Sequence, residues 1–222
     1  MKLPQSLLRF LRFRLRTLLI FVTFAACGLS WLATKMREAE RQRAAVEYFS
    51  ELGYRFFYDY HDQSDGGRLY RLTNKPSIPS LVLALFGRDL FCNVEAMYLP
   101  DGVRSTAMDS DFARVAALPH LKYLNLRRSE ITDGGLKHVE NLTELEILDL
   151  TGRPITDSGL MRLEGLVNLK NLWMFRTQVS DAGLVHLSSL TKLTYLDVQD
   201  THVTRQGANE LQKSLPKCTI VD

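Results

Sequence analysis

The sequence is poor in the residues that hold small folds together covalently. It contains three cysteines, Cys27, Cys92 and Cys218, an odd number that builds no complete disulfide framework. They are also too widely spaced for the paired ligands of a structural zinc site. We therefore interpret all three as small hydrophobic residues. For Cys27, the preceding FAA stretch leaves lipidation open as an alternative.

Catalytic motifs are missing as well. No serine or cysteine has an evident histidine and carboxylate partner for nucleophilic catalysis, and the sequence has no glycine-rich phosphate loop. The acidic residues around His61 do not have the spacing of a calcium loop. We predict that the protein is not an enzyme and uses neither a cofactor nor a metal.

Most of the chain also lacks an excess of either charge. The net charge is +3, but residues 1–47 hold nine basic and three acidic side chains. The other residues hold 19 basic and 22 acidic side chains, and a mildly acidic surface is poorly suited to a phosphate backbone. We therefore expect no nucleic-acid partner. The basic residues instead flank a hydrophobic segment, where they indicate membrane topology.

That hydrophobic segment, residues 17–34, contains no charged side chain, and a helix needs about 20 residues to cross a membrane. The basic segment 1–16 precedes it without a single acidic residue, whereas Glu38 and Glu40 follow it. We predict a single-pass anchor that contacts lipid through residues 1–34, with a cytoplasmic N-terminus and a repeat domain in a periplasm-like space. A cleaved signal peptide is the alternative.

The next segments connect the anchor to the main domain. Residues 35–53 are rich in Glu, Arg and Ala and end at a glycine, which predicts a charged stalk helix. Residues 54–93 are expected to form an N-terminal capping region. It would contain an aromatic strand over residues 54–61 and a helix over residues 81–92 that covers the first repeat.

An ungapped repeat of 24 residues begins at Leu118 and decides the fold class. In each unit, alternating leucines predict a short strand with one buried side, and the central leucines are Leu124, Leu148, Leu172 and Leu196. A Thr or Ser then caps a helix, and the Asp after it suits the helix dipole. The pattern predicts an α/β solenoid over residues 94–222, with parallel strands on its concave face and helices on its convex face. A degenerate unit would open it near residue 94, and an edge strand would close it near residues 215–221.

The block L-x-x-L-x-x-L-x-L followed by I-T-D-x-G-L resembles the leucine-rich-repeat superfamily, in the subtype also found in F-box-linked proteins. With its anchor and stalk, the chain resembles planctomycete-type bacterial membrane-anchored leucine-rich-repeat proteins. This resemblance implies a right-handed solenoid that binds a partner without catalysis; no F-box is visible, so no ubiquitin-ligase role is implied. The family often has Asn, Cys or Thr after the strand. Here Arg153 interrupts a hydroxyl series at that position, formed by Ser129, Thr177 and Thr201.

The residues between the core leucines should point outward from the strands in three columns. Aromatic residues there are typical anchors of protein recognition, although cross-strand packing is an alternative role for them. We predict a recognition or scaffold module for a protein or peptide, tethered to a bacterial membrane. The alternative is an envelope protein that self-associates through its stalk or edge strands. The predicted binding residues are Trp173, Phe175, Tyr123, Ile147, Tyr195, Asn125, Asp149, Asp197, Arg127 and Gln199.

Overall fold

The computed structural model describes residues 5–58 and 92–222, with side chains from residue 19 onward. The described chain divides between residues 40 and 41 into two compact units. The first helix, α1 (Gln5–Glu51), continues through the predicted anchor and the predicted stalk without interruption. It ends just before Gly53, whose φ of 91° suits a glycine at the end of a helix.

The first unit exposes large apolar side chains. Phe21 and Phe24 are 71% and 75% exposed, and Leu29 and Trp31 are also exposed. By length and composition, this part of α1 is apolar enough to cross a membrane. That finding agrees with the hydrophobic segment identified from the sequence.

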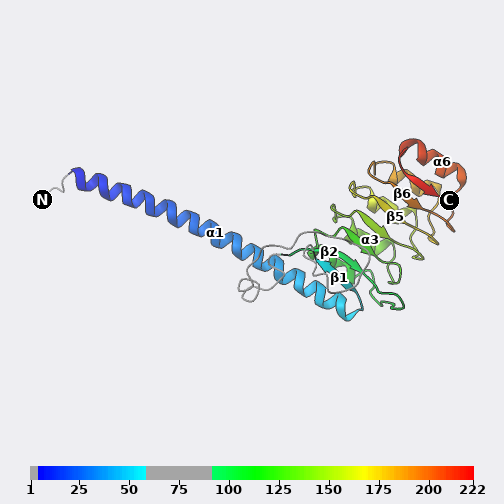
Figure 1. Ribbon diagram of the computed structural model, residues 1–222, viewed down its shortest axis with the longest axis horizontal. Coiled ribbons are helices and arrows are strands. Elements are labelled where there is room, and N and C mark those ends of the chain that lie inside the picture. The colour runs from blue at the N-terminus through cyan, green and yellow to red at the C-terminus, as the bar shows by residue number, and fades with distance from the viewer. Residues whose placement is uncertain (1–4, 59–91) are drawn as a thin grey trace. The chain divides into compact units, whose positions relative to one another are not determined.

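In the second unit the described strands form one sheet whose spatial order follows the sequence (Figure 1). Strands β2 to β7 run parallel, as the repeat predicts, whereas β1 pairs antiparallel with β2. β1 accounts for part of the aromatic strand predicted over residues 54–61; residues 59–61 lie outside the described part of the chain. The strands are β1 (Arg55–Tyr58), β2 (Val94–Tyr98), β3 (Tyr123–Asn125), β4 (Ile147–Asp149), β5 (Asn171–Trp173), β6 (Tyr195–Asp197) and β7 (Thr219–Val221).

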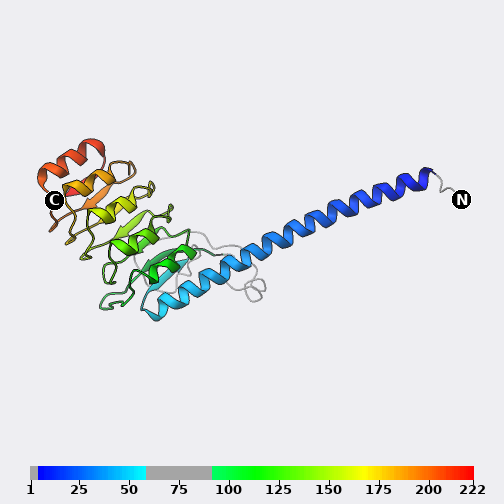
Figure 2. The ribbon, with the colours of Figure 1, turned by 180° about the vertical axis from the view of Figure 1, so that it is seen from behind.

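Helical segments cover one side of this sheet (Figure 2), so the layered arrangement follows the prediction. Each helix is short because a 24-residue unit must also supply a strand and two turns. The segments are η2 (Asp111–Ala117), α3 (Asp133–Val139), α4 (Asp157–Leu160), η3 (Met161–Leu163), α5 (Asp181–Leu184), η4 (Val185–Leu187) and α6 (Arg205–Ser214).

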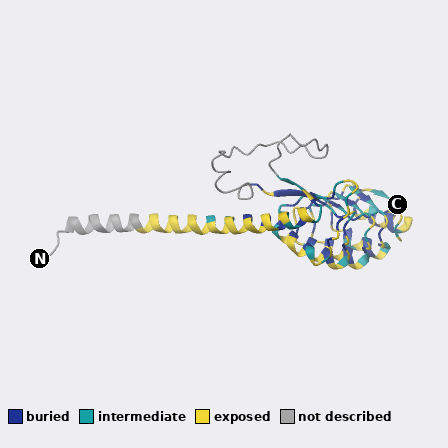
Figure 3. Cartoon of the chain, turned by 90° about the horizontal axis from the view of Figure 1, so that it is seen from below, coloured by how far each residue is buried: buried dark blue, intermediate teal, exposed yellow. Residues whose placement is uncertain are grey.

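The core lies between the strands and the helical segments (Figure 3). Leu124, Leu148, Leu172 and Leu196 pair in register across β3 to β6, and none of them has exposed surface. This continuous buried row confirms the central prediction of the repeat. A single unit has no such interior, because each leucine is covered by its counterparts in neighbouring units.

The last turns of α1 cover the first repeat. Phe49 is fully buried, and its ring centroid lies 5.6 Å from that of Phe112. The Gln42 side chain donates to the carbonyl oxygen of Cys92 at 2.8 Å and accepts from the amide of Val94 at 3.4 Å. The predicted capping helix over residues 81–92 lies outside the described residues apart from Cys92, which is not helical. In the described chain, part of the predicted stalk therefore caps the solenoid.

Neighbouring repeats are joined by an aspartate ladder, formed by Asp109, Asp133, Asp157 and Asp181. Asp157 is typical of the four. Its carboxylate accepts from the amide and the hydroxyl of Ser180 in the next repeat, at 2.7 and 2.6 Å. Ser180 also accepts from the amide of Ala182 and so caps α5, as predicted. The sequence suggested only a helix-dipole role for these aspartates; the structure shows that they also connect the repeats.

The glycine of the I-T-D-x-G motif is explained by the same ladder. A Cβ atom at Gly159 would lie 2.3 Å from Oδ1 of Asp133 and 2.9 Å from Cγ2 of Ile155. Both distances are too short for real atoms, so only glycine leaves room for the preceding aspartate. Within the motif, Thr or Ser caps the helix and Asp accepts hydrogen bonds from the next repeat. Gly leaves room for the aspartate of the previous repeat.

Candidate functional site: the strand face

The predicted binding residues lie on one surface, the strand face, formed by the outward side chains of β3 to β7 and the residues just after them. Tyr123, Ile147, Asn171 and Tyr195 pair in register as a first column that Thr219 extends onto β7. Their side chains are half-buried, except for the exposed Thr219, and on β3 to β6 they precede the buried leucine of the strand. The second column contains Asn125, Asp149, Trp173, Asp197 and Val221.

An aromatic group occupies the C-terminal half of the strand face. The ring centroids of Trp173 and Tyr195 are 5.8 Å apart, with an angle of 46° between the rings. Phe175 lies beyond the end of β5, with the guanidinium of Arg176 4.8 Å from its ring centroid. Arg176 also pairs with Asp200 at 3.1 Å. The structure therefore brings Trp173 and Tyr195 together, whereas Phe175 is partly covered by Arg176.

A second aromatic group lies on β1 and β2 and was missed by the sequence reasoning. Phe57 and Tyr98 stack with ring centroids 5.4 Å apart and an angle of 5°. Phe57 pairs with Ala96, which in turn pairs with Tyr123 of the first column. The aromatic run at residues 54–60 was the available signal. The antiparallel pairing that adds this strand to the sheet could not be derived from the repeat, because β1 is not part of it.

Three polar residues of the second column have a structural role. Asn125, Asp149 and Asp197 each accept, through Oδ1, the backbone amide two residues later, at 2.9 to 3.1 Å. Such bonds stabilise the turn that ends a strand. Asn125 also donates to the Tyr123 hydroxyl and to Oδ2 of Asp149, both at 3.2 Å. Trp173 interrupts this turn motif.

The charges on the strand face are unevenly distributed. In the two columns of β3 to β7, Asp149 and Asp197 are the charged residues, and both are half-buried. The predicted binding residues Arg127 and Gln199 follow β3 and β6 and are exposed. Burial raises the pKa of the Tyr123 hydroxyl above its usual value.

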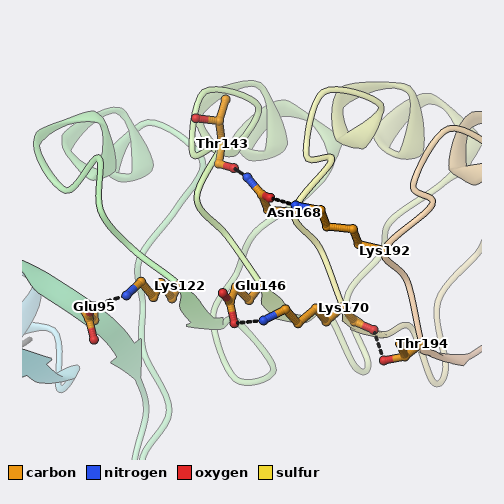
Figure 4. A network of polar contacts seen from close by, with 8 residues as sticks. All are labelled: Glu95, Lys122, Thr143, Glu146, Asn168, Lys170, Lys192 and Thr194. Carbon is orange, nitrogen blue, oxygen red and sulfur yellow. Dashed lines mark hydrogen bonds and ion pairs between the residues drawn. The ribbon is translucent and has the colours of Figure 1, made fainter. Parts of the chain in front are cut away.

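Other polar groups along the repeats are satisfied by neighbouring units (Figure 4). Lys170 pairs with Glu146 at 2.7 Å, and Lys122 pairs with Glu95; the hydrogen bond to Glu95 raises the pKa of Lys122. Lys192 donates to Asn168 at 2.6 Å. These contacts connect adjacent units and do not form a reactive cluster. Among the described residues, no group of three His, Cys, Asp or Glu side chains is placed to hold a metal.

The hydroxyl series after the strands is interrupted as the sequence indicated. Ser129, Thr177 and Thr201 each donate to the carbonyl oxygen three residues earlier, at 2.6 to 2.8 Å. Arg153 occupies the equivalent position between Ser129 and Thr177, and its guanidinium donates to the carbonyl oxygen of Ser129 in the preceding repeat. Its Nε atom is buried, and no hydrogen-bond partner is found for it in the described chain.

Comparison with known proteins agrees with this geometry. A leucine-rich-repeat family model matches residues 117–138. The fold is leucine-rich-repeat-like. No curated protein matches the chain. The single matched segment covers the first unambiguous repeat, so the other units are assigned from their 24-residue period and from the sheet register.

Several solved leucine-rich-repeat structures are similar to parts of the chain. An internalin from Listeria monocytogenes is 25% identical over 56% of this chain and 34% of its own length, with a TM-score of 0.46. Internalin C2 from the same species is 32% identical over 49% of this chain and 44% of its own, with a TM-score of 0.42. A leucine-rich-repeat protein from Leptospira interrogans is 20% identical over 64% and 39%, with a TM-score of 0.42. The chain therefore spans less than half the length of these three proteins.

Proposed function

We propose that this protein is a non-enzymatic recognition module that binds a protein or peptide on its strand face while α1 tethers it to a bacterial membrane. The observation that carries the proposal is the placement of Trp173 and Tyr195 on the outward side of adjacent strands, half-buried and 5.8 Å apart. Partly exposed aromatic rings on a rigid sheet supply much contact area at little entropic cost. Leucine-rich-repeat proteins generally mediate protein–protein interaction, and a family model of these repeats matches the chain.

The tether is supported by the apolar side chains that α1 exposes in the first unit. Leu19, Phe21, Phe24 and Leu29 are each more than half exposed, which is costly in water and favourable in lipid. The basic segment before them favours a cytoplasmic N-terminus. In this arrangement the repeats lie on the extracytoplasmic side, where they meet envelope or external proteins.

The direct test is affinity capture from envelope extracts with the full chain in detergent. We expect Trp173→Ala and Tyr195→Ala to reduce capture of specific partners at least tenfold, because truncation of a central aromatic anchor typically costs about 2 kcal/mol or more. Val185→Ala is the matched control, because Val185 is 69% exposed and lies on η4, among the helices that cover the other side of the sheet. If both aromatic variants fold and retain the same partners as the wild type, the strand face is not the binding surface.

A further inference from the structure

We propose that the strand face selects a cationic side chain of its partner, a lysine or an arginine, and seats it on Trp173 beside Asp197. This inference rests on the proposed function and specifies the chemistry of the ligand. It depends on four observations: the register around Trp173, the hydrogen bonds of the two neighbouring aspartates, the distribution of basic residues, and the geometry of the aromatic pair.

Trp173 lies between two carboxylates. It pairs in register with Asp149 on β4 and with Asp197 on β6. Adjacent strands are about 4.8 Å apart, so both acids flank the indole within reach of one bound side chain. An anionic group placed over this ring would be repelled from both sides, whereas a cation would be attracted from both.

The two carboxylates differ in how many of their oxygens are already bonded. Both oxygens of Asp149 accept hydrogen bonds, from the amide of Thr151 at 2.9 Å and from Asn125 at 3.2 Å. Asp197 accepts the amide of Gln199 through Oδ1 at 3.1 Å, and no described residue donates to its Oδ2. We therefore assign Asp197 as the main acceptor for a partner's cation and Asp149 as a supporting charge.

Among the described residues, the two columns supply no cation at this place. Neither column of β3 to β7 contains a lysine or an arginine. The nearby Arg176 lies over Phe175 and pairs with Asp200. The negative charge at Trp173 is therefore not neutralised within the described columns, and a basic partner is complementary to it.

The rings favour the same ligand. Indole is the best aromatic acceptor for a cation, and such contacts become stronger as the cation loses water. Tyr195 is tilted by 46° to Trp173 at 5.8 Å, so its ring forms a second wall next to Asp197. An aliphatic side chain would gain the contact with the rings but not the charge, whereas lysine or arginine gains both.

A displayed random peptide library, selected on the detergent-solubilised full chain, tests this inference. We expect the bound peptides to be enriched in Lys and Arg relative to the input library. Asp197→Asn should weaken the selected peptides roughly fivefold to tenfold, about the value of one partly desolvated cation contact. The matched control is Glu210→Gln, which removes an equal charge from an exposed position of α6, outside the strand face, and keeps an oxygen that can accept the hydrogen bond from Gln206; it should change affinity less than twofold.

The outcomes separate the two proposals. Peptides that depend on Trp173 but show no basic enrichment, or that respond equally to Asp197→Asn and Glu210→Gln, overturn the cation site and leave the proposed function standing. If no peptide is selected, the cation site is rejected. If the selected peptides bind Trp173→Ala and Tyr195→Ala as well as the wild type, both proposals are rejected.

A second measurement needs no ligand. The chain has two tryptophans, so Trp31→Phe leaves Trp173 as the single indole reporter. Each quenching constant is divided by that of free N-acetyltryptophanamide, because iodide is intrinsically the stronger quencher of indole. We expect this ratio to be larger for caesium than for iodide, and Asp197→Asn to reduce that difference while Glu210→Gln does not. If the two ratios are equal, the site has no preference for cations and the inference is wrong.

Discussion

At the scale of single residues, the repeat motif combines two requirements that the sequence shows only as a pattern. Thr or Ser as a helix cap was predictable, because capping is local. The partner of each aspartate was not, because it lies 23 residues away and becomes a neighbour only when the repeats stack. The motif glycine is required because that aspartate lies against it, so the sequence alone did not reveal the role of the glycine either.

The steric role of the motif glycine gives a stability prediction. We expect Gly159→Ala to lower the free energy of unfolding by about 1–3 kcal/mol, because its Cβ would overlap Asp133 and force the ladder apart. Gly165→Ala is the matched control: its Cβ would lie 3.8 Å from the nearest atom, the Glu140 carbonyl oxygen. Chemical denaturation of the full chain measures both variants, and equal stabilities would contradict the steric explanation.

Tyr54 gives a prediction about pH. Burial raises the pKa of its hydroxyl from 10.0 to about 12, so the folded state favours the neutral form more strongly than the unfolded state does. This contribution to stability is fully present below pH 10 and is lost as the pH rises towards 12. The wild type should therefore lose stability in that interval, measured by denaturation at each pH. Tyr54→Phe should lose less; an identical decline would show that Tyr54 is not the cause.

At the scale of elements, the parts that repeat were the parts that could be predicted. The period of 24 predicted the position of β3 to β6 and of the buried leucine in each, since every unit repeats the same local pattern. The elements at the N-terminal end do not repeat. The pairing of β1 with β2, and the packing of Phe49 against Phe112, depend on contacts between distant residues.

The same distinction applies to the strand face. Which side chains point outward followed from strand alternation. The structure pairs the first two predicted columns in register, whereas the residues of the third follow the ends of the strands. Strand alternation could not predict which of these side chains are already bonded to, or covered by, other residues of the chain. Asn125 and Asp149 bind each other, and Phe175 is covered by Arg176. The sequence therefore identified the surface but could not rank its residues.

At the scale of the whole molecule, the proposed orientation across a membrane is testable with cysteine chemistry. Cys92 and Cys218 are buried, and burial raises the pKa of the Cys218 thiol to about 11, so neither should react quickly near neutral pH. Cys27 lies in the apolar part of α1 and should be shielded by lipid.

We therefore expect Lys213→Cys, at an exposed position of α6, to react with a membrane-impermeant maleimide once the outer envelope is permeabilised. The unmodified chain in the same cells is the control for background labelling. If labelling of Lys213→Cys requires lysis of the inner membrane, the repeats are on the cytoplasmic side and the proposed topology is wrong.

The aspartate ladder has a consequence for how such an array grows. Every interior unit carries both an acceptor for the next unit and a donor for the one before, so an additional copy of residues 142–165 would fit between its neighbours with all its bonds complete. At the next place in the series, however, the chain has Arg205, the first residue of α6, which offers no acceptor. One side chain per unit therefore decides whether a further unit can be bound through the ladder, and Arg205 cannot bind one.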